Sequence, residues 1–271
     1  MYNRTFYTLL TLIFIFNACA PNPYSKTNRL YKAEAKQFAR NIREIPTNNL
    51  LDSVEVNPYW IGTTNFNLRK PNYVIIHHTA QNSCDATLRA FTMTKSQVSA
   101  HYVICKDGTV HHMLNDYLRS WHAGVSKWGI NTDINSSSIG IELDNNGFES
   151  FPDAQINSLL HVLKSLKEQF KIPVANFIGH GDIAPTRKND PNVSFPWELL
   201  AQKGYGLWFT DTTAMVPQQF DNITALRIIG YDTRDTAAAI QAFNRHFMKD
   251  TSKIIDESAR KVLFDLSKKY F

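Results

Sequence analysis

The chain has 271 residues, of which 43% are apolar and 20% charged, and its formal net charge is +5. This composition is typical of a folded globular protein and excludes a disordered chain. No Lys/Arg-rich run stands out, so the sequence gives no support for nucleic-acid binding.

The first 19 residues are predicted to be a signal peptide. One early cation, Arg4, precedes an apolar stretch over residues 6–16. A stable membrane-spanning helix needs roughly 20 apolar residues, so this stretch is too short for an anchor and is typical of a secretory signal. The sequence therefore predicts an exported protein that is either periplasmic or secreted.

Cys19 lies where a lipidation site is expected. The segment FNAC resembles the lipobox of bacterial lipoproteins, although Phe16 and Asn17 depart from its usual residues. A lipidated Cys19 would hold the protein at a membrane leaflet, as in an outer-membrane lipoprotein. Ordinary cleavage after Ala18 or Ala20 would instead release it.

The residues after the signal peptide predict a tether and then an α/β domain. Residues 20–52 are polar and form the tether, with one helical pattern over residues 30–44. Residues 53–203 alternate short apolar runs with helical patterns, which predicts a mixed central β-sheet flanked by helices. The expected elements are, in chain order, a strand over 73–78, a helix over 84–93, a hairpin over 102–114, a strand over 138–143, a helix over 151–170, a strand over 174–180 and a helix over 195–202.

Residues 205–271 differ from the preceding domain in their predicted secondary structure. They contain three helical patterns, over 222–233, 235–248 and 257–271, and no strand pattern. A segment of about 65 residues with this pattern predicts a small three-helix C-terminal domain, whose size suits docking on a neighbour.

Cys84 and Cys105 are the two cysteines outside the N-terminal segment. In an exported protein they could form a disulfide, but nothing in the sequence fixes the distance between them. A disulfide and two free thiols therefore both stay open. Neither cysteine lies in a CxxC motif, so zinc binding through thiolates is not indicated.

Histidines and a carboxylate gather at predicted strand ends. His77 lies at the end of the strand over 73–78, and His180 ends the strand over 174–180, with Asp190 ten positions later. Two His and one carboxylate match the composition of a hydrolytic zinc site, in which three protein ligands leave a fourth position for water. The plainer interpretation is that all three are ordinary hydrogen-bonded polar residues.

Two more charged residues fit hydrolytic chemistry beside such a site. Glu142 lies in the apolar strand over 138–143, where a carboxylate is costly unless it has a partner. It is either a general base whose pKa is raised by burial or one half of a structural ion pair. Lys188 is either a cation that stabilises an oxyanion or an ordinary solvated lysine of a loop.

Five segments appear in an order that is typical of one enzyme family: VIIHHTA, SAHYVICKDGTVH, WHAGVSKWG, SIGIELDN and IGHGDIAPTRKNDP. Through these segments, residues 72–200 resemble the zinc-dependent N-acetylmuramoyl-L-alanine amidases. This group, the amidase 2 family, is related to phage T7 lysozyme and to the peptidoglycan recognition proteins. The whole layout resembles the periplasmic lipoprotein amidases of Gram-negative bacteria, and residues 205–271 resemble their peptidoglycan-binding module.

The resemblance implies a role for each matched residue. His77, His180 and Asp190 would bind one zinc ion per chain, Glu142 would be the catalytic carboxylate, and Lys188 would stabilise the oxyanion. Three further residues match positions that line the substrate cleft: His101, Trp121 and His122. One departure is Asn192, which stands where relatives usually have glycine and is expected to adopt left-handed backbone angles.

The implied reaction is hydrolysis of the amide bond between N-acetylmuramic acid and L-alanine, with peptidoglycan or muropeptides as the partner. The alternative is a non-catalytic peptidoglycan-binding protein of the recognition type. Such proteins usually lack a zinc ligand, whereas this chain retains all three positions. No nucleic acid and no obligate protein partner are implied.

Overall fold

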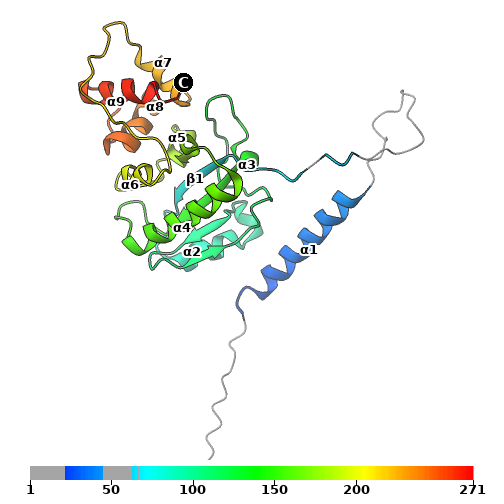
Figure 1. Ribbon diagram of the computed structural model, residues 1–271. Coiled ribbons are helices and arrows are strands. Elements are labelled where there is room, and N and C mark those ends of the chain that lie inside the picture. The colour runs from blue at the N-terminus through cyan, green and yellow to red at the C-terminus, as the bar shows by residue number, and fades with distance from the viewer. Residues whose placement is uncertain (1–21, 45–62, 66, 271) are drawn as a thin grey trace, which may run out of the picture. The chain divides into compact units, whose positions relative to one another are not determined.

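The computed structural model describes residues 22–44, 63–65 and 67–270 (Figure 1). The predicted signal peptide and Cys19 lie outside these residues. The chain divides into two units, residues 1–64 and 65–271. In the first unit, helix α1 (Ser25–Arg43) confirms the helix expected within the tether. Within the described part of the chain, none of the helices combines the length and the apolar character that crossing a bilayer requires.

The second unit is built on a five-stranded mixed sheet with the order β3-β2-β4-β1-β5. Its strands are β1 (Tyr73–His78), β2 (Tyr102–Ile104), β3 (Val110–His112), β4 (Ser138–Leu143) and β5 (Phe177–Gly179). All neighbouring pairs are parallel except β2 and β3, which form the expected antiparallel hairpin. The predicted mixed α/β sheet is thereby confirmed.

Alternation of side chains gives the sheet two buried faces. Val74 and Ile76 of β1 pack into one hydrophobic core, whereas Ile75 packs into the core on the opposite face. His77 lies two residues after Ile75, so its side chain projects from the second face, and His78 projects from the first. The pleat of β1 therefore separates the two adjacent histidines.

Helices α4 (Asp153–Phe170) and α6 (Trp197–Gln202) cover the first face. The apolar stripe of α4 is buried as its 3.6-residue spacing predicts, at Ile156, Leu159, Leu163, Leu166 and Phe170. Full burial of one such side chain stabilises a fold by about 1.5–3 kcal/mol. The buried stripe of α4 therefore contributes strongly to the core on this face.

The second face is covered partly by the C-terminal helices. Ile75 and Ile178 of the sheet share one hydrophobic cluster with α7 (Asn222–Ile229), α8 (Thr236–Phe243) and α9 (Glu257–Ser267). Figure 1 draws these helices beside α5 (His180–Ile183), and α5 contacts α8. The three expected helices are confirmed, and they lie within the same compact unit as the sheet.

A disulfide joins Cys84 and Cys105, whose Cα atoms are 5.4 Å apart. Cys84 is the first residue of α2 (Cys84–Phe91), and Cys105 directly follows β2. The disulfide therefore fastens α2 to the end of the sheet at which the site described next is found. Of the two alternatives left open by the sequence, the structure has the paired one.

Candidate active site

His77 and His180 meet because their strands are parallel neighbours. His77 is near the carboxyl end of β1, and His180 directly follows β5, which pairs with β1. Carboxyl ends of parallel strands share one edge of a sheet, which is where open α/β sheets bind ligands. The loop after α5 then returns Asp190 to the same point, because the Gly181 N–H donates to the Asp190 carbonyl at 2.6 Å.

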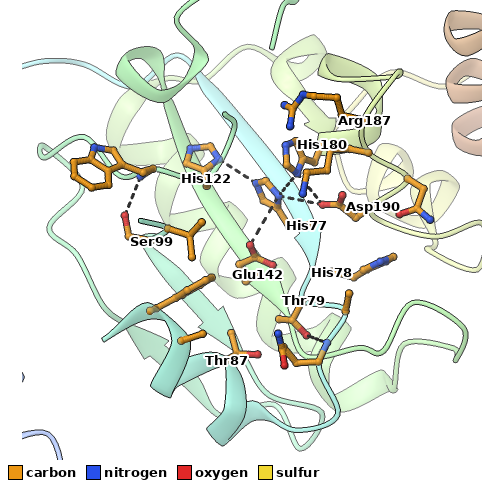
Figure 2. Close-up of a pocket in the computed structure, with 18 residues that line it drawn as sticks. His77, His78, Thr79, Thr87, Ser99, His122, Glu142, His180, Arg187 and Asp190 are labelled. Atoms are coloured by element: carbon orange, nitrogen blue, oxygen red, sulfur yellow. Dashed lines mark hydrogen bonds and ion pairs between the residues drawn. The ribbon is translucent and has the colours of Figure 1, made fainter. Parts of the chain in front are cut away.

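Three potential ligand atoms converge at this edge (Figure 2). Nδ1 of His77 lies 2.9 Å from Nδ1 of His180 and 3.1 Å from Oδ2 of Asp190, and the remaining His180–Asp190 distance is 3.0 Å. The three residues are only 1%, 4% and 6% exposed. The predicted ligand set is therefore brought together and shielded from bulk water.

The hydrogen bond on the far side of His180 fixes its tautomer. Its Nε2 atom lies 3.1 Å from the carbonyl oxygen of Ala123. A carbonyl can only accept, so Nε2 carries a proton, and in the neutral ring that binds a metal the Nδ1 atom presents a lone pair.

A longer chain of hydrogen bonds fixes the tautomer of His77. Ser138 donates its hydroxyl proton to the Ile134 carbonyl at 2.6 Å, so its oxygen accepts from Nε2 of His122 at 3.0 Å. Nδ1 of His122 is then an acceptor, and it receives the Nε2 proton of His77 at 3.0 Å. Nδ1 of His77 consequently carries a lone pair, like that of His180.

These tautomers make the centre suitable for a cation. Two imidazole lone pairs and a carboxylate oxygen face one another at about 3 Å, which is repulsive unless a positive charge lies among them. Burial, followed by the neighbouring His180, lowers the pKa of His77 to about 4, so His77 is neutral at pH 7 as a metal ligand must be. Neutral imidazoles with a carboxylate are the donor set of hydrolytic zinc sites.

Gly140 of β4 makes room for the ring that orients His77. A Cβ atom at this position would lie 2.5 Å from Cγ of His122. The glycine in SIGIEL therefore allows His122 to lie flat over the strand. Burial and the nearby His77 hold the pKa of His122 well below its usual value, which keeps this ring neutral too.

Glu142 is the register partner of His77 across β4 and β1. Its Oε1 atom lies 4.0 Å from Nδ1 of His77, and its Oε2 atom is buried without a hydrogen-bond partner among the described residues. Burial, reinforced by the negative charge of Asp190 and opposed by Lys188, raises the pKa of this carboxyl to about 8. A carboxylate that binds protons this readily is well matched to general acid–base chemistry near neutral pH.

A cavity of about 330 Å³ opens directly onto these groups. Figure 2 shows His77, Glu142, His180 and Asp190, four of the lining residues, directed toward one another. Lys188 is exposed and lines the same cavity. The volume is in the range of small-molecule sites, so the cavity offers a substrate access to an acid–base group, a cation and the ligand triad together.

Of the three residues expected to line the cleft, two line the cavity. Trp121 lines the cavity with a side chain that is 49% exposed, and the buried His122 lines it as well. His101 is not among the residues that line this cavity, and its expected place in the substrate cleft stays a prediction. It is fully buried beneath the segment over residues 116–120: its Nδ1 atom accepts from the Gly140 N–H, and its Nε2 atom donates to the Leu118 carbonyl at 3.0 Å.

Asn192 also differs from its expectation. It is not among the residues with positive φ, so the turn after Asp190 does not depend on a left-handed backbone there. Its side chain donates instead to Oδ1 of Asn145 and to the Glu149 carbonyl, and its N–H donates to Nδ1 of His78 at 3.1 Å. His78 therefore supports the loop on the face opposite the ligands.

The sequence does not indicate that Asp182, a buried carboxylate next to the potential ligands, accepts several hydrogen bonds at once. Asp182 of α5 accepts from the Gly179 N–H at 2.8 Å, from the Tyr231 hydroxyl at 3.0 Å and from Nδ1 of His246 at 2.7 Å. Two of these three partners, Tyr231 and His246, come from the C-terminal part of the chain. A separation of 64 residues leaves no sequence signal for the pairing with His246.

Comparison with known proteins relates this site to one enzyme family. The family described as N-acetylmuramoyl-L-alanine amidase matches residues 67–193. The N-acetylmuramoyl-L-alanine amidase AmiD of Escherichia coli (strain K12) is 33% identical over 206 residues, which cover 64% of this chain and 74% of AmiD. The 1,6-anhydro-N-acetylmuramyl-L-alanine amidase AmpD of the same strain is 40% identical over 101 residues, covering 37% of this chain and 55% of AmpD.

Two solved structures are similar over most of the chain. The complex of E. coli AmiD with anhydro-N-acetylmuramic acid-L-Ala-D-gamma-Glu-L-Lys has a TM-score of 0.69 at 28% identity, covering 80% of this chain and 97% of that one. AmpDh3 of Pseudomonas aeruginosa in complex with anhydromuramic pentapeptide has a TM-score of 0.68 at 28% identity, with 81% and 99% covered. The likeness therefore extends past residue 193 into the helical part.

Proposed function

This chain belongs to the N-acetylmuramoyl-L-alanine amidase family and is an amidase of peptidoglycan muropeptides, and we propose that it works with one zinc ion held by His77, His180 and Asp190. The bond cleaved is the amide between N-acetylmuramic acid and L-alanine. The observation that carries the proposal is the convergence of three lone-pair atoms beside a carboxyl group of raised pKa. Nothing supports the non-catalytic alternative.

The metal and the chain have separate tasks. When bound, zinc would supply Lewis acidity, polarising the substrate carbonyl and lowering the pKa of a water molecule. His77 and His180 are kept in the required tautomer by His122 and by the Ala123 carbonyl. Hydrogen bonds of this kind orient metal ligands and raise their basicity.

Glu142 would transfer the proton of the reaction, and Lys188 would stabilise its negative charge. Glu142 would accept the proton of the attacking water at its buried carboxylate and deliver it to the leaving amine of L-alanine. A pKa raised toward neutral pH suits both steps, because the carboxylate is then a stronger base than usual and its acid form can still give up the proton. Lys188 would stabilise the negative charge that develops on the carbonyl oxygen.

We also propose anhydromuramyl peptides as one substrate class, since the complexes of AmiD and AmpDh3 contain such ligands. The half-exposed Trp121 offers an apolar surface at the rim, against which a sugar ring or an alanine methyl group could pack. Peptidoglycan binding by residues 205–271 remains a prediction, which co-sedimentation of the whole chain with sacculi would test.

Export is a further part of the proposal and rests on the N-terminal sequence. The apolar stretch over residues 6–16 and the adjacent Cys19 predict a periplasmic protein, lipidated or released. Labelling of the expressed protein with radioactive palmitate would decide between these two fates. Loss of the label in Cys19→Ser is expected if lipidation occurs.

The central experiment is digestion of purified anhydromuramyl peptide, followed by chromatography and mass spectrometry of the products. Free stem peptide should appear, should be lost after treatment with a chelator and should return with one equivalent of zinc. Glu142→Gln should retain zinc but release no peptide. Full zinc occupancy with tight muropeptide binding and no released peptide in the unaltered protein would refute the mechanism.

A further inference from the structure

The net charge of the chain is concentrated in helix α1. This helix contains six Lys and Arg residues and a single acidic residue, Glu34. The rest of the chain is formally balanced, with 23 Lys and Arg against 23 Asp and Glu. The formal charge of +5 is therefore the charge of one 19-residue helix, and a search for basic runs misses it because the cations are spaced three or four residues apart.

The cations and the apolar side chains of α1 lie on opposite sides. Tyr31, Ala35, Phe38 and Ile42 follow the i, i+4, i+7, i+11 spacing of a single helical stripe. The basic residues occupy the opposite half of the helical wheel: Lys26, Arg29, Lys32, Lys36, Arg40 and Arg43. The helix is thus divided lengthwise into an apolar and a cationic side.

Within its own unit, residues 1–64, the described residues offer the apolar stripe no partner. No side chain of α1 is buried, and Phe38 and Ile42 are 49% and 69% exposed. Most of the stability of a helix in a protein comes from packing of its amphipathic face against another surface. Contact with an apolar phase would bury the stripe, and anionic groups beside that phase would pair with the cationic side.

A phospholipid surface supplies both at once. Helices with a Lys/Arg-rich side and aromatic or aliphatic residues on the opposite side lie in the plane of a membrane interface. Anionic headgroups attract each nearby Lys or Arg. Peptidoglycan also carries carboxylates, but it has no apolar phase to receive Phe38 and Ile42. The charge pattern and the stripe together favour lipid.

We propose that α1 binds in the plane of an anionic phospholipid membrane, with Tyr31, Phe38 and Ile42 at the boundary of headgroups and acyl chains. The cations on the other side then reach the lipid phosphates. This contact does not depend on lipidation of Cys19. It would keep the amidase unit, residues 65–271, close to the membrane even in a chain that is cleaved and released.

The test uses the chain from Ala20 onward, which keeps every residue that the structure describes, and measures co-sedimentation with vesicles. Binding is expected to equimolar phosphatidylglycerol and phosphatidylcholine, to weaken as salt rises, and to be far weaker to phosphatidylcholine alone. Phe38→Gln with Ile42→Gln, and separately Lys26→Gln with Lys32→Gln and Lys36→Gln, should each lower the partition coefficient on the order of 100-fold.

A matched control removes the same charge elsewhere. Lys70→Gln, Lys164→Gln and Lys253→Gln change three exposed lysines of the other unit and should leave vesicle binding unaltered. All variants should cleave muropeptides like the unaltered chain, so a failure of the proposal is distinguishable from a failure of the proposed mechanism. Equal binding to both vesicle types, equal loss in the control, or capture by sacculi in place of vesicles would each overturn it.

Discussion

Replacement of Glu142 by Gln should stabilise the metal-free protein while abolishing its activity. In the folded state the pKa of this carboxyl is raised from 4.5 to about 8, with burial as the largest cause. The folded protein therefore holds a proton at Glu142 that the unfolded chain has already lost between these two pH values. Stability contributed by the neutral carboxyl is present below pH 4.5 and is lost as the pH rises toward 8.

The magnitude follows from the shift. At pH 7 the unfolded chain is about 2.5 pH units above its own pKa, which corresponds to a destabilisation of about 3 kcal/mol by the buried acid. Gln has nearly the same shape and no charge, so it removes this term. The free energy of unfolding of Glu142→Gln should thus exceed that of the unaltered protein by about 3 kcal/mol at pH 7 and by about zero at pH 4.5.

The assay is urea unfolding, followed by tryptophan fluorescence, in the presence of a chelator at both pH values. Addition of zinc should shrink the difference at pH 7, because a cation beside Glu142 favours its ionised form. Glu168→Gln, at an exposed position of α4, is the control and should change stability by less than about 0.5 kcal/mol at either pH. An equal effect of Glu142→Gln at pH 4.5 and pH 7, or no effect at all, would refute the reasoning.

Three other changes probe separate parts of the same unit. Ser138→Ala removes the acceptor for Nε2 of His122 and should weaken zinc binding about 10–100-fold, as measured by competition with a chromogenic chelator; unchanged affinity would mean that the chain of hydrogen bonds does not orient His77. Lys188→Gln should lower kcat by about 100-fold without altering zinc affinity, and a rise in KM alone would argue for substrate binding instead. Cys84→Ser with Cys105→Ser should lower the free energy of unfolding by about 2–4 kcal/mol, with amidase activity retained at low temperature.

Much of the site could be predicted because strand ends carry the information. His77, Glu142 and His180 each lie at or near the end of a short apolar run, and parallel strands bring such ends to one edge of the sheet. The alternation of β1 also predicts that His77 and His78 face opposite ways. These inferences need only local pattern and the geometry of a sheet.

The contacts between distant loops and helices could not be predicted in this way. Alternation places His101 on the face opposite Tyr102, but whether it reaches the cleft depends on the segment over residues 116–120, which lies on top of it. The proton chain through Ser138 depends on a ring orientation that no spacing encodes. The pairing of Cys84 with Cys105 depends on how α2 lies against β2, which is a matter of packing.

Because of Asp182, the C-terminal helices cannot easily be replaced in evolution without also changing the part of the chain that carries the candidate site. Two of its three donors, Tyr231 and His246, come from the C-terminal helical part, and the carboxylate lies two residues from the proposed ligand His180. A recombination event that exchanged these helices for another module would leave the buried Asp182 without two of its donors, directly behind the proposed metal site. The new module would have to bring donors for this one carboxylate, so such an exchange is constrained by chemistry as well as by shape.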